Sequence, residues 1–275
     1  MNTIEIQKLI SDKVDGVWIA EHDITGHHYR NTQTGQLVDS VTTKIIIEKE
    51  HLIRWAVKKG IEWLEVGRRW EYLQMEDMRQ EYITGASTAY TEIRDDAGSI
   101  GTVAHDAIED YLKAWLKAGE QPEDIRTFFK PDADSRSVAS ARAAEKVMTK
   151  RNIIPIATEL LVGSERYGCA GTLDFLCIVD GQVELWDWKT SNHMSDDYAM
   201  QVSAYWAFFH EMTGIRAKTV RIMHLSKDSD RFTSYIVPNL PSAYKAFKGL
   251  STAYDWLHNN KPKLKKDIKS KKIKL

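Results

Sequence analysis

Cysteine, proline and long apolar runs are all scarce in this chain of 275 residues. Its two cysteines, Cys169 and Cys177, are too few for a disulfide framework or for an iron–sulfur cluster held by four cysteines. No apolar run approaches the roughly 18 residues of a membrane span. The N-terminus lacks the basic segment and apolar core of a secretory signal. These absences predict a cytoplasmic protein in a reducing compartment, without a membrane partner or an iron–sulfur cluster.

A strong excess of charge of one sign is also missing, because the formal net charge is −1. A composition that is 43% hydrophobic and 28% charged is that of an ordinary globular protein. The charge is unevenly distributed, since residues 261–275 hold eight lysines and one aspartate while the preceding 260 residues sum to about −8. Such a lysine run is either a solvated tail or a segment that adds non-specific affinity for DNA.

Two apolar runs in the second half of the chain predict a β-hairpin. Residues 171–179 alternate in a way typical of a strand, and residues 183–189 form the return strand. Asp180-Gly181 between them is a strong signal for a two-residue hairpin turn. With the turn at this position, the numbers of paired residues sum to about 361 across the hairpin.

This register brings charged side chains together. It places Asp174 opposite Asp187, and the alternation puts Lys189 on the same face as Asp187, with Trp186 and Trp188 on the other face. Two carboxylates that close repel each other unless a cation lies between them, and oxygen ligands suit Mg²⁺ or Mn²⁺. Lys189 could then touch a phosphate or polarise a water. The alternative is a solvated hairpin with an Asp–Lys ion pair.

Several motifs occur around this hairpin in a fixed order. They are Gly101-x-x-x-His105-x-x-x-Glu109, Glu159, Gly171-x-x-Asp174, Asp187-x-Lys189 and Gln201-x-x-x-Tyr205. In this order they resemble the motifs of the PD-(D/E)XK nuclease superfamily, specifically its RecB-like branch. Residues 40–43 and 52–56 also resemble the N-terminal region of the mitochondrial genome maintenance exonuclease group and its phage-encoded relatives.

The resemblance implies a fold. We expect an α/β (α+β) protein with a restriction-endonuclease-like core, in which helices flank a central mixed β-sheet, plus a helical N-terminal region. The chain would divide into an N-terminal hairpin and helical region at 1–134, the nuclease core at 135–260 and the lysine-rich tail at 261–275. The order predicted for the core is helix, three strands, helix, strand, strand.

The resemblance also implies an activity, namely a metal-dependent DNA exonuclease that serves phage or mobile-element replication or recombination. The residues implied as catalytic are Asp174, Asp187, Lys189 and Glu159. Those implied as ligands of Mg²⁺ or Mn²⁺ are His105, Asp174, Asp187 and the main-chain carbonyl of Trp188. Those predicted to bind DNA are Gln201, Tyr205, Thr190, Arg68 and Arg69. The partners implied are DNA that is single-stranded or has a free end, and a replication or recombination protein.

Each of these residues also has a structural interpretation. A lone helical histidine such as His105 is usually structural, and Glu159 could be an ordinary acid on an exposed strand. Tyr205 could be a core tyrosine whose hydroxyl is satisfied. Arg68 and Arg69 stand among aromatic residues, a pattern typical of a core stripe with a solvated basic face or of a helical wall that touches DNA.

The N-terminal half is predicted to be mainly helical. Residues 44–80 have helical periodicity with a break at Gly60, and residues 100–118 form a second helix on which His105 and Glu109 share one face. Thr42 or Thr43 is the expected cap of the first helix. Further helices are expected at 137–151, 198–212 and 241–258, and further strands at 27–31, 36–41, 153–162, 219–225 and 233–237.

If the helical region contributes His105 to the metal site, it must pack across the open side of the hairpin. A substrate would then pass through a covered channel, which favours a flexible strand with a free end and hence an exonuclease. A structure-specific endonuclease of the same superfamily is the second hypothesis. A DNA-binding module with a decayed nuclease site is the third, and the intact set of acids and lysine argues against it.

Overall fold

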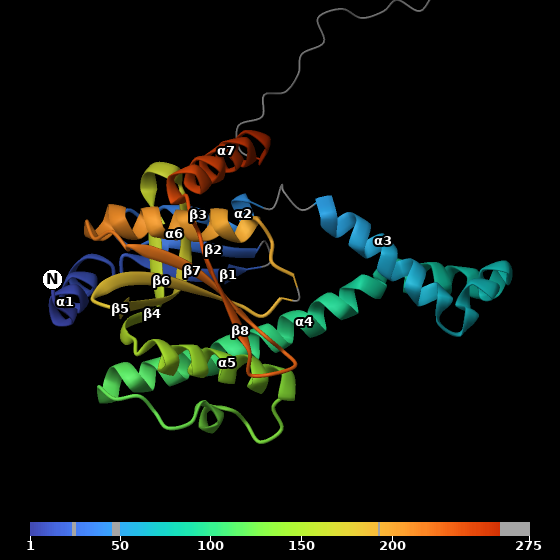
Figure 1. Cartoon of the computed structure of the whole chain (residues 1–275). Coiled ribbons are helices and arrows are strands. Elements are labelled where there is room, and N and C mark those ends of the chain that lie inside the picture. The colour runs from blue at the N-terminus through green and yellow to red at the C-terminus, as the bar shows by residue number, and fades with distance from the viewer. Residues whose placement is uncertain (24–25, 46–49, 192, 259–275) are drawn as a thin grey trace, which may run out of the picture.

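The computed structural model describes residues 1–275 except 24–25, 46–49, 192 and 259–275 (Figure 1). The lysine-rich tail predicted at 261–275 therefore lies outside the described residues. The helices are α1 (Thr3–Lys13), α2 (Val41–Lys44), α3 (Glu50–Glu65), α4 (Glu76–Ala118), α5 (Ser135–Arg151), α6 (Asp197–Thr213) and α7 (Leu240–His258), with 3₁₀ segments η2 (Val66–Gln74), η3 (Ile125–Phe128) and η4 (Glu165–Tyr167). None of the described helices is long and apolar enough to cross a membrane.

The strands form one mixed sheet of eight. They are β1 (Trp18–Asp23), β2 (Gly26–Asn31), β3 (Leu37–Ser40), β4 (Ile154–Ser164), β5 (Cys169–Val179), β6 (Gln182–Lys189), β7 (Thr219–Leu225) and β8 (Phe232–Ile236). The order is β1-β2-β3-β5-β6-β7-β8, and β4 pairs with β5 off this path. The β3–β5 and β6–β7 pairs are parallel and the other pairs antiparallel. The α/β fold class with a central mixed sheet is thus confirmed, as is the predicted order of the core elements.

Helices cover both faces of this sheet (Figure 1). On one face, residues of α1, α6 and α7 pack with Leu173, Leu176 and Leu185. On the other face, α4 and α5 pack against Phe175 and Trp186. From Phe175 to Cys177 of β5, and at Leu185 and Trp186 of β6, neighbouring residues thus enter different cores, as expected for a doubly covered strand. Leu173 departs from this alternation, because it lies two residues before Phe175 but in the other core.

The hairpin of β5 and β6 has the predicted register. Phe175 pairs with Trp186 and Val179 with Gln182, so paired numbers sum to 361. Asp180 and Gly181 have φ of 50° and 75°, the left-handed values that a type I′ turn needs at both central positions. The turn residues and the apolar alternation therefore specify the same register.

The N-terminal segment joins the same sheet instead of forming a layer of its own. The hairpin predicted at 27–31 and 36–41 is present as β2 and β3. β1 was not predicted, and it pairs with β2. β3 lies beside β5 in parallel, so residues near the N-terminus extend the sheet that carries Asp174.

The predicted helix boundaries near the N-terminus need correction. Ser40, not Thr42 or Thr43, caps α2 through its side chain, which accepts from the main-chain N–H of Thr43. The break expected at Gly60 is absent, because α3 continues through it. A Cβ at Gly60 would lie 2.6 Å from the Ala86 carbonyl oxygen, so this glycine lets α3 approach α4 closely. The chain reverses later, at Gly67 and its neighbour, where φ is positive.

Helix α4 is 43 residues long, and the predicted helix at 100–118 is only its C-terminal part. That part packs on the sheet, whereas its N-terminal part runs out of the core beside α3 and η2 (Figure 1). We call residues 50–99 the arm. Where burial is described in the arm, Gly60 and Ala89 are its buried residues. The expectation that the whole helical region covers the hairpin is therefore wrong, because only the part of α4 from Ile100 onward packs there.

Candidate metal centre

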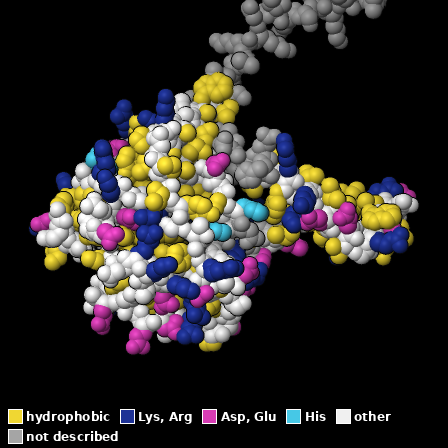
Figure 2. Space-filling model, viewed as in Figure 1, with side chains coloured by type: hydrophobic (Ala, Val, Ile, Leu, Met, Phe, Trp, Pro, Cys, Tyr) yellow, Lys and Arg dark blue, Asp and Glu magenta, His cyan; other side chains and the backbone are white. Residues whose placement is uncertain are grey.

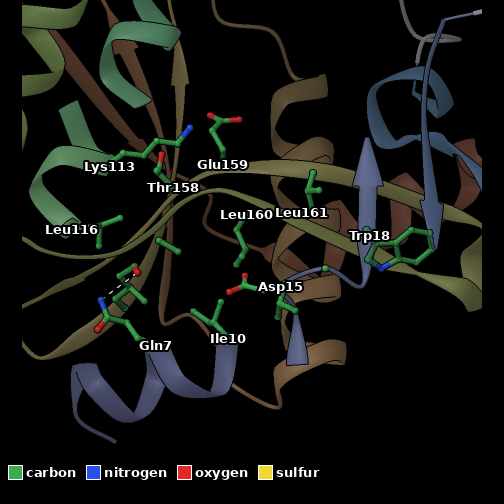
Figure 3. Close-up of a pocket in the computed structure, with 14 residues that line it drawn as sticks. Gln7, Ile10, Asp15, Trp18, Lys113, Leu116, Thr158, Glu159, Leu160 and Leu161 are labelled. Atoms are coloured by element: carbon green, nitrogen blue, oxygen red, sulfur yellow. Dashed lines mark hydrogen bonds between the residues drawn. The ribbon is translucent and has the colours of Figure 1, made fainter. Parts of the chain in front are cut away.

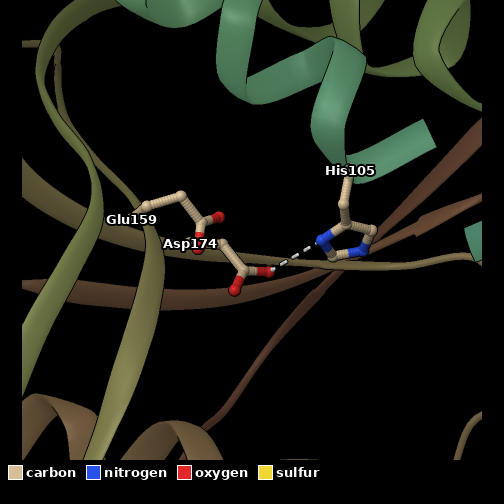
Figure 4. A group of neighbouring side chains, drawn as sticks. All are labelled: His105, Glu159 and Asp174. Atoms are coloured by element: carbon tan, nitrogen blue, oxygen red, sulfur yellow. Dashed lines mark ion pairs between the residues drawn. The ribbon is translucent and has the colours of Figure 1, made fainter. Parts of the chain in front are cut away.

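Three of the predicted residues converge at one point of the structure. His105 comes from α4, Glu159 from β4 and Asp174 from β5, and each side chain points toward the other two (Figure 4). One potential ligand atom from each residue lies within 4.8 Å of the other two. His105 Nδ1 is 3.9 Å from Asp174 Oδ2. Segments far apart in the sequence thus bring one imidazole and two carboxylates to a site of the size that a metal ion needs.

Asp174 is fixed from two sides. Its Oδ2 accepts the main-chain N–H of Trp188 at 2.8 Å, so the side chain bridges β5 and β6. The main-chain carbonyl oxygen of Asp174 accepts a hydrogen bond from the hydroxyl of Thr158 on β4 at 3.0 Å. Thr158 was not singled out in the sequence, where a threonine beside Glu159 gives no distinct signal. The first contact holds the carboxylate against β6, and the second holds the main chain of Asp174 against β4.

Glu159 has an unusual backbone for a residue within a strand. Its φ is +48°, in the left-handed region that a residue with a Cβ adopts at a cost of about 1–3 kcal/mol. Burial and, after it, the charge of the neighbouring Asp174 together raise the pKa of its carboxyl to about 9. The surroundings therefore hold an acid at a point where its negative charge is unfavourable without a cation.

Asp187 and Lys189 lie next to this cluster as a pair. Asp187 is fully buried, and its Oδ2 is 2.6 Å from Lys189 Nζ. Asp187 Oδ1 has no hydrogen-bond partner among the described residues. Burial raises the pKa of Asp187 to about 6, although Lys189 acts in the opposite direction. Burial likewise raises the pKa of Asp174, against the effect of Lys189.

The lysine itself stays charged. Burial alone would lower the pKa of Lys189, but Asp187 and Asp174 together raise it above its ordinary value. Its ammonium also lies 4.9 Å from the centre of the Tyr198 ring. The predicted common face of Asp187 and Lys189 is confirmed by their contact, and the two tryptophans of β6 lie in the core on the other side.

His105 is neutral, in contrast to the charged Lys189. Burial and then the Lys189 ammonium lower the pKa of His105 to about 4, while a hydrogen bond to the main chain of Trp188 acts against this. A neutral imidazole is the form that binds a metal. The main chain of Trp188 also lies beside His105, as its predicted role as a carbonyl ligand requires.

The donor set fits a divalent cation. Two carboxylates whose charge is unfavourable, a neutral imidazole and a buried carboxylate oxygen without a hydrogen bond are stabilised by one positive ion. Oxygen ligands with one nitrogen suit Mg²⁺ and, because of the imidazole, also Mn²⁺. Of the predicted ligands, Asp187 stands apart, because its carboxylate contacts Lys189 and is not one of the three residues within 4.8 Å of each other.

The predicted pair on α6 supports the site from inside the core. Gln201 and Tyr205 are both buried, and the amide of Gln201 donates to the Tyr205 hydroxyl at 3.0 Å. A Cβ at Gly171 would lie 2.4 Å from Tyr205 Cε1, so the glycine of the motif makes room for this ring. The prediction that these two side chains contact DNA is not supported by their position, because they have almost no exposed surface.

Thr190 is buried as well, at 8% exposure. A Cβ at Gly101 would lie 2.9 Å from the Thr190 hydroxyl oxygen. Gly101 lies inside α4, and its missing side chain lets this helix approach Thr190 closely. This contact joins the helix that carries His105 to the end of β6.

Arg68 and Arg69 are not brought to the metal centre. They lie in η2, at the outer end of the arm (Figure 1). Arg69 donates to the Trp63 carbonyl at 3.1 Å, and its guanidinium lies 4.3 Å from the centre of the Trp63 ring. Arg68 pairs with Glu71. The placement of these arginines in a channel over the site is therefore wrong, because the chain reverses at Gly67 far from the sheet.

Two tyrosines near the site were missed. Tyr198, which lies beside Lys189, shares a helix face with Gln201 and Tyr205, and this spacing was a usable signal. The Tyr29 hydroxyl lies 3.0 Å from the Thr172 hydroxyl. Burial raises the pKa of Tyr29, and the nearby Glu159 adds to the rise. Nothing local in the sequence of β2 indicates that Tyr29 reaches β5.

A pocket of about 490 Å³ adjoins the site along β4 (Figure 3). Glu159 and Lys113 lie at one end of it, and Trp18 lies at the other. Of the predicted site residues, it contains Glu159 alone. The pocket is therefore a neighbour of the metal centre and not the space around the paired acids.

Comparisons with known proteins add little to this geometry. No protein-family model matches the chain. No curated protein matches it either. The solved structure titled "Crystal structure of SSO0001" is similar over 58% of this chain and 75% of that chain, with 14% identity and a TM-score of 0.30. A likeness of this size carries no argument about fold or activity.

Proposed function

We propose that this protein is a metal-dependent DNA exonuclease that hydrolyses phosphodiester bonds with Mg²⁺ or Mn²⁺. The observation that carries the proposal is the meeting of His105, Glu159 and Asp174 within 4.8 Å, next to the buried pair of Asp187 and Lys189. An imidazole, three carboxylates and a charged lysine in one place are the groups that metal-assisted phosphoryl chemistry uses. The resemblance to RecB-like nucleases points to the same reaction.

Each residue has a role in this proposal. His105, Asp174 and Glu159 would hold the cation, with Asp187 and the Trp188 carbonyl beside them. The bound metal would supply Lewis acidity, which favours ionisation of a water and offsets charge on the phosphate. Lys189 is close enough to orient the attacking water and to stabilise negative charge on the phosphoryl oxygens. Thr158 and the Trp188 N–H keep the Asp174 carboxylate in position.

The endonuclease alternative gains support from one observation. The preference for a free end assumed that helices cover the hairpin, but α3 and η2 extend away from the sheet (Figure 1). An uncovered site admits an internal stretch of a strand as readily as an end. The resemblance still favours the exonuclease, with action in phage or mobile-element replication or recombination, beside a protein of that machinery.

The deciding experiment compares linear single-stranded, linear duplex and closed circular single-stranded DNA, each incubated with Mg²⁺ or Mn²⁺. The exonuclease proposal expects loss of linear single strands and survival of the circle. Lys189→Ala is the inactive control, and Lys150→Ala, an exposed lysine at the end of α5, is the matched active control. Rapid cutting of the circle by the wild type and not by Lys189→Ala would establish the endonuclease. Equal cutting by Lys189→Ala would reject both.

A further inference from the structure

The arm exposes an apolar stripe along α3. Ile53, Val57 and Ile61 follow one another at a spacing of four residues and are 65%, 58% and 53% exposed. Residues at this spacing share one side of a helix. Apolar side chains gather along the arm in the space-filling view (Figure 2). Of the described residues, none buries this stripe.

A different side of α3 already packs on α4. The Trp55 ring meets Tyr90 edge-on at 6.2 Å, and Gly60 lies against the main chain of Ala86. The stripe is therefore not the surface that joins the two helices of the arm. An isolated helix side that carries three large aliphatic residues needs a second surface to bury them.

The charge of the arm argues against DNA as that second surface. Residues 50–99 hold ten acidic and seven basic residues, a net charge of −3. DNA phosphates are bound by an excess of positive charge, which this region lacks. A protein surface of matching chemistry is the better occupant.

The charges along α3 are arranged so that the helix complements a reversed copy of itself. On the N-terminal side of Gly60, α3 carries three basic residues, Arg54, Lys58 and Lys59, and one acid, Glu50, whereas its charged residues beyond Gly60 are Glu62 and Glu65. In an antiparallel pair of α3 helices that cross near Gly60, the basic part of each would face the acidic part of the other. Lys58 and Glu62 already approach each other to 3.7 Å within one helix, but their side chains remain 72% and 41% exposed.

We propose that the arm binds a second copy of this chain through antiparallel pairing of the two α3 helices. The two-fold axis passes near Lys59 and Gly60, so Val57 of one chain lies beside Ile61 of its partner, and Arg54 lies beside Glu65. Such a contact is isologous and closes with two copies. The proposal concerns association alone and does not depend on the nuclease activity.

The first test is the mass of the full-length protein by sedimentation velocity over a range of micromolar concentrations. The wild type is expected to reach twice the monomer mass, and the double variant Val57→Asp/Ile61→Asp is expected to remain a monomer. Ile154→Asp is the matched control, because Ile154 is a similarly exposed isoleucine, at 49%, on β4. A wild type that is monomeric throughout overturns the proposal, as does a dimer that both variants leave intact.

The second test reverses the charges on α3, so that association is lost in each variant and is restored when the two variants are mixed. Arg54→Glu/Lys58→Glu makes α3 acidic along its length, and Glu62→Lys/Glu65→Lys makes it basic. Each variant alone is expected to be monomeric through repulsion, and an equimolar mixture is expected to form the two-chain species again. Circular dichroism of each variant checks that the arm is still helical. Failure of the mixture to associate, with both arms folded, rejects the antiparallel arrangement.

A third experiment tests whether another segment of the same chain covers the apolar stripe of α3. The lysine-rich segment after residue 258 is positively charged, whereas the arm is negatively charged. If the wild type is monomeric and dimerises only after residues 259–275 are deleted, that segment covers the stripe and the proposal is wrong. Dimerisation of both proteins, with loss on Val57→Asp/Ile61→Asp, supports it.

Discussion

The sheet core and the arm are built from the same kind of amphipathic segment but differ in how completely they are packed. In the core, helices cover both faces of the sheet, and side chains such as Phe175, Leu176 and Trp186 have no exposed surface. In the arm, α3 packs on α4 along one side and exposes Ile53 and Val57 along another. Packing from all sides fixes side chains precisely, and the candidate metal centre lies in this well-packed region and not in the arm.

The two regions also differ in where residues other than glycine have a positive φ. Among the described residues, four that are not glycine have positive φ: Arg68, Asn152, Glu159 and Asp180. Three of them lie where the chain must turn or a helix must end, which explains their conformation. Glu159 lies within β4, where no reversal is needed. Its strain is therefore not explained by a turn, and it places Glu159 in the cluster with His105 and Asp174 that the proposed function uses.

The largest expected difference between the regions concerns cleavage. We expect Asp187→Asn or Lys189→Ala to lower the rate about a thousandfold or more, because in the proposed reaction the first removes a carboxylate beside the cation and the second removes positive charge beside the phosphate. Lys59→Ala, in an arm lysine that pairs with Glu62 at 2.7 Å, should leave the rate unchanged at equal protein concentration. Initial rates on end-labelled linear DNA, with thermal unfolding curves for every variant, provide the measurement. A fully active, folded Lys189→Ala would end the assignment.

Helix α4 belongs to both regions, and His105 lies near the start of the part that packs on the sheet. Loss of this imidazole in His105→Ala should raise the Mn²⁺ or Mg²⁺ concentration for half-maximal rate by about 10–100-fold, with a smaller loss at saturating metal. Thr102→Ala, an exposed position one turn nearer the arm, is the control. Metal titrations of the cleavage rate distinguish the two. An unchanged titration for His105→Ala would make this histidine a structural residue.

Two glycines test how far each region tolerates added volume. In Gly171→Ala the new methyl group would meet the Tyr205 ring at 2.4 Å, so we expect the free energy of unfolding to fall by about 1–3 kcal/mol. In Gly60→Ala the clash at 2.6 Å with Ala86 should instead separate α3 from α4. Hydrogen exchange should then accelerate in the arm alone, while the denaturation midpoint of the core is unchanged. A global loss of stability in Gly60→Ala would show that the arm and the core unfold together.

The smallest expected effect concerns ion pairs. Lys44 is 2% exposed and contacts Asp255 at 2.7 Å, so Asp255→Asn should destabilise the core by roughly 1.5 kcal/mol. Glu62→Gln removes an acid that pairs with Lys59 on the surface of the arm, and it should destabilise the protein less than Asp255→Asn because solvent screens this pair. Denaturant titrations of the two variants beside the wild type measure both changes. Equal losses would mean that solvent screens the two pairs alike.

Local patterns predicted the hairpin of β5 and β6 well because its determinants are local. The alternation of apolar residues and the Asp180-Gly181 turn both specify one register, which the structure has from Phe175–Trp186 to Val179–Gln182. The helices from α5 onward were predicted within two residues of their ends, since periodicity and end signals agree there. The pairing of Asp187 with Lys189 follows from the same alternation and needs no tertiary information.

Glycine positions show where such reasoning fails. Gly60 and Gly67 stand seven residues apart in similar surroundings, and the sequence pointed to the first as the break. A glycine permits both a left-handed turn and a close helix contact, so its identity does not choose between them. The choice depends on whether another element lies against it, as Ala86 does at Gly60.

By itself, the sequence determined the α/β class, the hairpin register and the acids and lysine that meet on it, because turn chemistry and side-chain alternation act over a few residues. Only the tertiary structure decided that Glu159 completes the cluster with a left-handed φ, that β3 joins β5, and that the arm leaves the sheet. Those outcomes depend on contacts between separate segments, such as His105 with Glu159 and β3 with β5, or on contacts that α3 does not make with the other described residues. An apolar stripe on a helix indicates that this surface is buried against another one, but it does not identify the other surface.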